Sequence, residues 1–478
     1  MIGITSYGAY IPYHRLPRSV IGAFWGRPGG RGEKAICNYD EDSVTMAMAA
    51  ATDCLTSFEP KEVDGLFLAT TTSPYKERQG SAIVATALDL RRDIRAGDFT
   101  NCLRSGTIAL TSALDAISAG TAKSILVTTA DSRLGAAQGE LEQAVGDGAA
   151  CLMLGDSGVA VAIEGSFTLT DDFADFWRAA DDTFVRSWED RWGLDEGYRK
   201  ILPEAVSGVL QKCNLSPKDF AKAVFYGPNE RRHRELGRRL GFEPSQVQDP
   251  LFATVGNTGA ALAFMILIAA LEEAKPGDRI LLASYGNGAD ALVLRVTEEI
   301  EKIRDRRGIK RNLESKRTID SYGKYLRWRE LVPLERAARP ERSPVSISAL
   351  WRDRRNILAL YGLKCRHCGT PQLFMSGQST QARVCIACQA KDDFDDYLFA
   401  DKKATIFTFT QDLLAAAADP PNTTTVVDFE GGGRGIFQMT DREPEEVKVG
   451  MPVEMSFRKL YFDRGIHNYF WKTRPVRG

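Results

Sequence analysis

Three patterns in the sequence predict an α/β protein with an internal duplication and a smaller all-β region near its C-terminal end. The first is a series of apolar runs without polar alternation, which is typical of strands in a sheet buried on both faces. The second is a repeated order of loop, helix and strand, and the third is a set of short β-rich runs after residue 400. With 478 residues, the chain is also too long for a single core.

The buried strands and the duplication occupy the first 300 residues. Apolar strand-like runs occur at residues 65–70, 124–129 and 279–284. Residues 99–131 match 252–286, because both show a loop, a helix start of small residues, an apolar helix and a strand. We therefore expect one half at residues 1–165 and a second at 166–298, with a helical insert near 171–201 at the start of the second half.

The remaining 180 residues divide into three segments. Residues 299–345 are highly charged and predict a helical linker. Residues 346–400 predict a helix, at 350–361, followed by a cysteine cluster. Residues 401–478 contain short strand-like runs separated by Gly and Pro, which predicts a small β-barrel.

Composition and charge limit the kinds of partner. The chain is 44% hydrophobic and 26% charged, with a net charge of −1, so we expect neither nucleic acid nor a membrane surface as a main partner. No basic segment precedes a long apolar run at the N-terminus, and the longest apolar stretch, residues 260–271, is too short to span a bilayer. Five scattered cysteines favour a reducing compartment, so we expect a cytoplasmic protein.

Cys102 is the candidate nucleophile. It directly precedes a predicted helix of small residues, where the positive end of the helix dipole favours ionisation of a thiol. An isolated cysteine is more often a small buried apolar residue, but the duplication argues for a site. The equivalent helix start in the second half carries Gly256 and Asn257, and we expect the two helix starts to meet at the centre of the molecule.

These motifs together resemble the 3-hydroxy-3-methylglutaryl-CoA synthase branch of the thiolase superfamily. The resemblance implies a five-layered αβαβα thiolase-like fold, a homodimer, and CoA thioesters as substrates that acylate Cys102. It implies that Asn257 binds or activates the second thioester, and that backbone groups near Gly256, Gly286, Asn287 and Gly288 bind substrate and form an oxyanion hole. The matching stretches are residues 8–12, 39–47, 102–107, 146–150, 175–178, 256–258 and 284–288.

Two positions depart from the pattern of that family. Tyr226 occupies the position of the family's catalytic histidine, and Thr71 that of its catalytic glutamate. We expect Tyr226 to act as a replacement proton donor. His233 and Glu77 are less favoured candidates for displaced catalytic groups, and a solvated helix position is the favoured interpretation of His233.

The spacing Cys365-x2-Cys368-x16-Cys385-x2-Cys388 is typical of a zinc ribbon. Four protein ligands predict a closed, structural zinc site, with iron as the minor alternative. A ribbon followed by a barrel resembles the zinc-ribbon/OB-fold domains that accompany thiolase-like enzymes, which implies docking of a separate thiolase subunit. OB folds also bind nucleic acids, but the aromatic residues here are better explained as barrel core.

The favoured function is an acyltransferase that forms or cleaves a carbon–carbon bond through an acyl-Cys102 intermediate. Two alternatives stay open. One is a scaffold that channels intermediates from a separate thiolase, and the other is a retro-aldol enzyme that depends on Tyr226.

Overall fold

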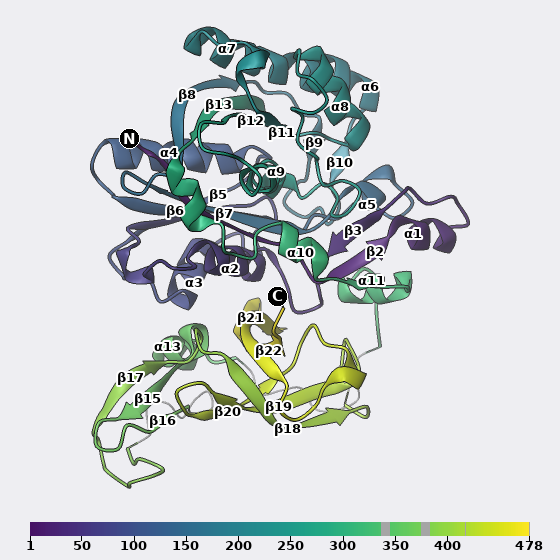
Figure 1. Ribbon diagram of the computed structural model, residues 1–478. Coiled ribbons are helices and arrows are strands. Elements are labelled where there is room, and N and C mark those ends of the chain that lie inside the picture. Colours follow the sequence, from purple (N-terminus) through teal and green to yellow (C-terminus); the bar gives the residue numbers. More distant parts are fainter. Residues whose placement is uncertain (336–344, 374–382, 416, 478) are drawn as a thin grey trace. The chain divides into compact units, whose positions relative to one another are not determined.

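The computed structural model describes residues 1–335, 345–373, 383–415 and 417–477 (Figure 1). The chain forms two compact units. The first consists of residues 1–37, 42–82 and 91–325, and the second of residues 38–41, 83–90 and 326–478. Within the described ranges, every helix is too short or too polar to cross a bilayer.

A nine-stranded sheet, in the order β11-β12-β13-β8-β1-β7-β6-β4-β5, organises the first unit. The first half of the chain supplies five neighbouring strands and the second half four, and only two residue pairs join β1 to β8 where the halves meet. The strands are β1 (Gly3–Tyr10), β4 (Gly65–Ala69), β5 (Arg95–Phe99), β6 (Ser124–Asp131), β7 (Gly148–Gly155), β8 (Val161–Thr170), β11 (Lys222–Phe225), β12 (Arg279–Tyr285) and β13 (Gly288–Val296).

Helices cover both parts of this sheet and also separate them. α2 (Ser43–Cys54) contacts β1, β6 and β7, whereas α7 (Arg199–Cys213) contacts β8, β12 and β13. Between the two parts of the sheet lie α4 (Ser105–Ser118) and α9 (Leu262–Leu271), and α9 contacts strands of both halves (Figure 1). The order α2, sheet, α4 with α9, sheet and α7 gives the expected five layers.

Local sequence explains how two of these helices form. Asp42 caps the start of α2 with a capping box. Its side chain accepts a hydrogen bond from the Thr45 backbone N–H, and the Thr45 hydroxyl accepts one from the Asp42 backbone N–H. In α9, nine of ten residues are buried, because a helix between two layers needs an apolar surface all round. The longest apolar stretch of the sequence, residues 260–271, thus forms a buried helix together with the turn that precedes it.

The insert between the halves is less helical than expected. It contains the two-residue strands β9 (Phe176–Trp177) and β10 (Arg186–Ser187), which pair antiparallel, then α6 (Asp190–Trp192) and the wide helical turn η2 (Gly193–Tyr198). Aromatic residues are frequent in this insert, and Phe173 stacks on Trp192 with ring centroids 4.3 Å apart.

Residues 299–325 fold as part of the first unit, in contrast to the linker expected there. They form η5 (Glu298–Ile303), α10 (Lys310–Glu314), β14 (Arg317–Thr318) and the start of α11 (Tyr322–Trp328). Two buried apolar residues, Ile300 and Ile303, anchor η5 although the segment is charged. Residues 336–344 of the expected linker lie outside the described residues.

Smaller elements complete the first unit. β14 extends a three-stranded sheet with β2 and β3. These elements are β2 (His14–Pro17), α1 (Arg18–Phe24), β3 (Glu33–Ile36), η1 (Pro60–Glu62), α3 (Gly80–Ala87), α5 (Glu140–Ala144), η3 (Pro217–Asp219), α8 (Glu230–Arg239) and η4 (Gly259–Ala261), and α3 continues into the second unit.

The second unit contains a five-stranded sheet in the order β20-β19-β18-β21-β22 and a three-stranded sheet in the order β16-β15-β17. The predicted helix 350–361 forms as two short helices instead of one. The elements are α12 (Ile347–Arg352), α13 (Arg354–Ala359), β15 (Tyr361–Cys365), β16 (Pro371–Gln372), β17 (Phe394–Leu398), β18 (Ala404–Asp412), β19 (Asn422–Phe429), β20 (Arg434–Gln438), η7 (Pro444–Glu446), β21 (Pro452–Asp463) and β22 (Ile466–Pro475).

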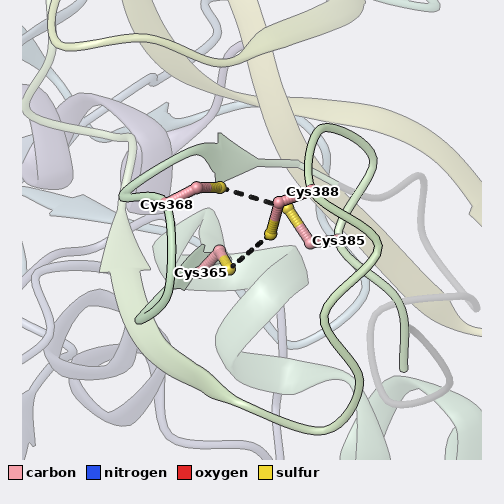
Figure 2. Close-up of side chains that lie close together, drawn as sticks. All are labelled: Cys365, Cys368, Cys385 and Cys388. Atoms are coloured by element: carbon pink, nitrogen blue, oxygen red, sulfur yellow. Dashed lines mark hydrogen bonds between the residues drawn. The ribbon is translucent and has the colours of Figure 1, made fainter.

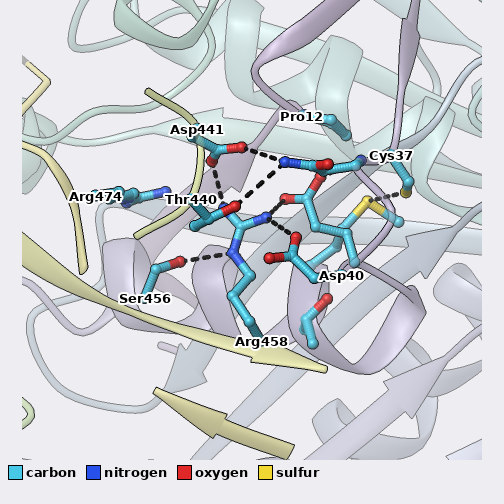
Figure 3. A network of polar contacts seen from close by, with 12 residues as sticks. Pro12, Cys37, Asp40, Thr440, Asp441, Ser456, Arg458 and Arg474 are labelled. Atoms are coloured by element: carbon cyan, nitrogen blue, oxygen red, sulfur yellow. Dashed lines mark hydrogen bonds and ion pairs between the residues drawn. The ribbon is translucent and has the colours of Figure 1, made fainter. Parts of the chain in front are cut away.

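A buried ionic cluster holds the segment Asn38–Glu41 within the second unit (Figure 3). The Arg458 guanidinium lies 2.6 Å from Glu41 and 2.5 Å from Asp441. The Lys472 ammonium lies 2.8 Å from Asp40, which is also 3.3 Å from Arg458. Each of these five side chains is at most 1% exposed.

Candidate active site and metal centre

Cys102 lies in a sharp turn before α4. The preceding residue, Asn101, has φ 72°, a left-handed conformation that costs energy for a residue with a side chain. Cys102 is partly exposed, and α4 begins three residues later with Ser105. The turn therefore presents the thiol next to the first N–H groups of the helix.

Arg104 ties this turn to the loop between β12 and β13. Its Nε donates to the Gly286 carbonyl at 2.9 Å, and its Nη1 lies 3.0 Å from Asp290. A Cβ on Gly286 would lie 2.9 Å from the Leu103 nitrogen, so only glycine permits this approach. The loop residues Gly286, Asn287 and Gly288 all have positive φ values. The structure thus brings this predicted loop against the Cys102 turn.

The expectation that Cys102 ionises more readily than a free thiol is wrong for this structure. Burial raises the pKa of the Cys102 thiol, although the Arg104 backbone N–H and the Arg104 charge act in the opposite direction. Asp290 adds to the increase. Desolvation therefore outweighs the donors at the start of α4.

The second helix start places Asn257 in a buried position beside Tyr226. The Asn257 amide donates to the Tyr226 hydroxyl at 3.0 Å, and its oxygen accepts from the Gly259 N–H at 2.9 Å. Gly256, with φ 95°, packs against the backbone of Gly146. The structure therefore places Asn257 and its neighbouring glycine beside Tyr226.

The two helix starts meet, as the duplication predicted. α4 contacts η4, and a Cβ on Gly106 would lie 3.3 Å from the Ala260 carbonyl oxygen. The predicted residues thus fall into two neighbouring sets. Cys102 lies with the Gly286–Gly288 loop, and Asn257 lies with Gly256 and Tyr226.

Tyr226 is 1% exposed, and its surroundings keep its hydroxyl protonated. Burial raises the pKa of the phenol, while the charge of nearby Arg133 and the hydrogen bond from Asn257 lower it. A phenol with a raised pKa stays neutral at physiological pH, so Tyr226 can donate a hydrogen bond or a proton there.

Thr71 is held by a buried carboxylate. Its hydroxyl donates to Asp131 at 2.8 Å, and Asp131 also accepts from Thr70 and Thr72. The second oxygen of Asp131 accepts from the Ala260 N–H at 2.8 Å, so this carboxylate joins the Thr70–Thr72 loop to the second helix start.

A pocket in the first unit opens beside Tyr226, and one of its three acidic lining residues, Asp175, is buried among tyrosines. Asp175 is 9% exposed, and burial raises its pKa although Tyr285 and Arg133 act in the opposite direction. The Tyr285 hydroxyl is buried beside Asp175, and burial and this carboxylate both raise the pKa of the phenol. The pocket is lined by Asp175, Phe176, Ser187, Trp188, Glu189, Asp190, Gly193, Leu194, Tyr198, Tyr226, Pro228, Asn229 and Tyr285.

His233 is not the solvated residue that its Arg-rich helix suggested. It is fully buried against Phe225, and its ring nitrogen lies 3.0 Å from the Gln248 carbonyl oxygen. Burial lowers its pKa to about 4, so it is a neutral core residue of α8. Glu77 is exposed and is absent from the pocket lining.

Five site residues were not selected from sequence. Three of them carry a weak signal. Arg104 lies inside the Cys102 motif, and Asp131 and Arg133 lie at the carboxyl end of a buried strand, where polar residues are unusual. Asp175 belongs to a matching stretch, and Tyr285 directly precedes the glycine loop.

Four cysteines of the second unit converge as predicted (Figure 2). Their sulfur atoms all lie within 4.8 Å of one another. The Cys365 and Cys388 sulfurs are 3.6 Å apart, and the Cys368 and Cys385 sulfurs are 3.5 Å apart. Tetrahedral zinc with bonds of about 2.3 Å needs sulfurs about 3.8 Å apart, so this ligand set fits a metal. Residues 374–382 of the predicted ribbon lie outside the described residues.

The layered fold and the two facing helix starts define a thiolase-type protein, and comparisons with family models agree. Residues 210–296 match the C-terminal domain of 3-oxoacyl-[acyl-carrier-protein] synthase III. Residues 399–458 match the C-terminal OB-fold domain of ChsH2, which confirms the predicted OB fold.

Sequence relatives define the family more closely. The chain is 33% identical over 341 residues to a hydroxymethylglutaryl-CoA synthase of Methanopyrus kandleri, covering 69% of this chain and 97% of the relative. It is 32% identical over 346 residues to one of Caldivirga maquilingensis, covering 70% and 99%. The chain therefore belongs to the hydroxymethylglutaryl-CoA synthase family, and it is a condensing acyltransferase of the thiolase superfamily.

Solved structures share the fold. "MvaS in complex with 3-hydroxy-3-methylglutaryl coenzyme A" has a TM-score of 0.62 at 19% identity and covers 72% of this chain and 94% of its own. The 3-oxoacyl-[acyl-carrier-protein] synthase III of Aquifex aeolicus has a TM-score of 0.56 at 23% identity and covers 62% and 100%.

Proposed function

We propose that this enzyme accepts an acyl group from a CoA thioester onto Cys102 and joins it to a second acyl thioester. The observation that carries the proposal is the contact between α4, which follows the Cys102 turn, and η4, which follows Asn257. In the first step the Cys102 thiolate attacks the thioester carbonyl, and the CoA thiolate leaves and takes up the proton that Cys102 lost. The raised pKa of Cys102 means that proton removal accompanies substrate binding.

The second step forms the carbon–carbon bond. In an aldol-type step, a proton leaves the α-carbon of the acyl group on Cys102, the resulting carbanion attacks a keto carbonyl of the second acyl group, and the new alkoxide takes up a proton. Asn257 and Tyr226 are our candidates for donors to that oxygen, with backbone groups of the Gly286–Gly288 loop serving the acyl-Cys102 carbonyl. Asp175 is a suitable group to move the proton, because its raised pKa is closer to neutrality. Water then hydrolyses the Cys102 thioester, which releases the product as a carboxylic acid and returns the Cys102 thiol.

Intact-mass spectrometry after incubation with acetyl-CoA tests the first step. Wild-type protein should gain the mass of one acetyl group, and the matched variant Cys102→Ser should not. Absence of an adduct with acetyl-CoA and longer acyl-CoAs would support the scaffold alternative. An adduct that survives in Cys102→Ser would place the nucleophile elsewhere.

The variant Tyr226→Phe tests the second step. It should still be acylated on Cys102, while condensation slows roughly 10²-fold, the size expected for one lost oxyanion donor or general acid. Loss of acylation together with condensation would instead indicate that Tyr226 holds the fold of the site. Full turnover in Cys102→Ala would support the retro-aldol alternative.

We also propose that the four-cysteine site holds structural zinc. Cys365, Cys368, Cys385 and Cys388 would supply all four ligands, so zinc would stabilise the fold and take no part in the reaction. Elemental analysis of purified protein should give one zinc per chain, and Cys385→Ser should lose it. One iron per chain would point to the rubredoxin-type alternative.

The proposed assembly of the enzyme rests on the family resemblance, and its proposed location rests on the scattered cysteines. We propose a cytoplasmic homodimer that can work beside a separate thiolase. Light scattering of the purified protein should give twice the chain mass of 52.7 kDa, and co-purification from the native host should recover the thiolase if it is a stable partner.

A further inference from the structure

Two arginines, Arg104 and Arg133, are buried around the candidate site, and they differ in the contacts that balance their charge. Arg104 is 7% exposed. It is fully used, because its guanidinium contacts the Asp290 carboxylate at 3.0 Å, the Gly286 carbonyl at 2.9 Å and the Asn287 carbonyl at 3.3 Å. Its charge and its donors are therefore satisfied inside the protein.

Arg133 is buried without such a partner. It is 6% exposed, two residues beyond the end of β6, and its guanidinium lies close to the neutral hydroxyl of Tyr226. Across the ranges that the structure describes, it forms no ion pair with a carboxylate.

The nearest acidic residues do not fill this role. Asp131 already accepts hydrogen bonds from Thr70, Thr71, Thr72 and the Ala260 N–H. Burial raises the pKa of Asp175 and the charge of Arg133 partly opposes this increase, but the two side chains form no ion pair in the part of the chain that the structure describes. Arg178, which donates to the Thr71 carbonyl, is close enough to Arg133 for the two positive charges to repel.

A buried guanidinium without a counter-charge is costly, and proteins keep such groups where a ligand supplies the charge. Its planar fork of N–H donors matches the two oxygens of a carboxylate. Tyr226 and the Asn257 amide add neutral donors next to it. The CoA phosphates are a poor alternative, because the long pantetheine arm separates them from the thioester carbon.

We propose that one of the two acyl thioesters used by this enzyme carries a free carboxylate on its acyl group, and that Arg133 binds this carboxylate. The inference rests on the proposed function and adds a substrate class to it. Arg133 thereby becomes a specificity-determining residue, and acyl groups that end in a methyl group leave its charge unmatched.

The test measures binding of matched acyl-CoA pairs to protein carrying Cys102→Ala, which leaves the thioesters intact. The pairs are malonyl- with propanoyl-CoA, succinyl- with butanoyl-CoA, and glutaryl- with pentanoyl-CoA, so that each pair differs by a carboxylate in place of a methyl group. Calorimetric titration should show at least one carboxylated member binding about 30-fold or more tightly than its neutral partner.

Three further variants in the same background assign that preference. Arg133→Met should abolish the difference within the pair, and Arg133→Lys should retain only part of it, since lysine keeps the charge and loses the fork. Arg231→Met, which removes an exposed arginine of α8, should leave it unchanged. A thermal melt of each variant shows that it is folded.

Two results would overturn the inference. One is the absence of any pair that differs more than about threefold, and the other is an Arg133→Met protein that keeps the preference. Failure of the proposed function looks different, because wild-type protein would then gain no acyl group on Cys102 from any thioester. If Arg133→Met fails to fold, the pairs measured on Cys102→Ala protein with Arg133 intact still decide the first result.

Discussion

The two units of this protein each bury a cluster of charges, and the two clusters differ in how they are balanced. In the second unit, Arg458 and Lys472 are matched by three carboxylates in direct contact, and every member is at most 1% exposed. In the first unit, Arg104 is matched by Asp290, while neighbouring Arg133 has no ion pair in the described chain. The same residue type thus occurs both as a satisfied and as an unsatisfied buried cation.

The balance of charge in each cluster indicates whether that cluster has a structural or a ligand-binding role. A balanced buried cluster fixes the conformation of its segment and needs nothing from solution. An unmatched buried charge lowers stability, and it is retained where a ligand completes it. Substitutions that remove one charge from each kind of site should therefore change stability in opposite directions.

Arg458→Met gives the largest expected effect. It leaves Asp40, Glu41 and Asp441 with too little positive charge, and breaking a buried ion pair from one side costs about 3–5 kcal/mol. Calorimetric melting of the full chain should show the second unit destabilised by that amount. The neighbouring Lys459→Met is the control, and a loss for Arg458→Met below about 1 kcal/mol would show that the cluster contributes little.

Glu272→Gln should stabilise the protein at alkaline pH. The Glu272 carboxylate accepts only backbone N–H groups, from Ile309 and Lys310, and burial raises its pKa from 4.5 to about 7. A raised pKa means that its stabilising contribution is full below pH 4.5 and is lost as the pH rises through 7.

The Gln variant should therefore gain up to about 3 kcal/mol over wild type at pH 8, and little at pH 4.5. Urea unfolding of both proteins at the two pH values measures the difference, in which other titrating groups cancel. An equal gain at both pH values would mean that titration of Glu272 is not the cause.

Arg133→Met should raise the free energy of unfolding by about 1–2 kcal/mol in the absence of ligand. The reason is that an apolar side chain of similar length replaces an unmatched buried charge. Arg104→Met is the matched control within the site, and it should destabilise because it leaves Asp290 unpaired. A destabilised Arg133→Met protein would mean that Arg133 is a structural cation like Arg104.

Glu230→Gln should have the smallest effect. Its pair with Arg234 on α8 is exposed, with side-chain exposures of 45% and 67%, and such pairs contribute less than about 0.5 kcal/mol. Chemical unfolding at low and at high salt should show that the free energies of unfolding of the variant and of wild type differ by no more than this amount. A larger loss would indicate that exposed charges of this protein are coupled in a network.

The sequence predicted most of the fold, because the information lies in short segments. Apolar runs identified the buried strands, and the repeat identified the two halves and their facing helix starts. The predictions from sequence failed in charged segments. Residues 299–325 are polar, yet they form part of the first unit because the few apolar residues among them, such as Ile300 and Ile303, are buried. His233 was misplaced for the same reason, since an Arg-rich helix can still bury one residue.

The site was partly predictable. Cys102, Asn257 and the four metal-ligand candidates belong to local motifs, so the sequence by itself predicts them as candidates. The partners of these residues come from distant segments. Arg104 meets Asp290 across 186 residues, and Thr71 meets Asp131 across 60.

Only the tertiary structure therefore decided which buried charges are balanced and which are not. The pKa of Cys102 rises because burial of the thiol outweighs the donors of the helix start. Among the described residues Arg133 forms no ion pair, because Asp131 is engaged by the Thr70–Thr72 loop and Asp175 does not reach it. Pairing and burial depend on how distant segments pack, and a linear motif does not record them.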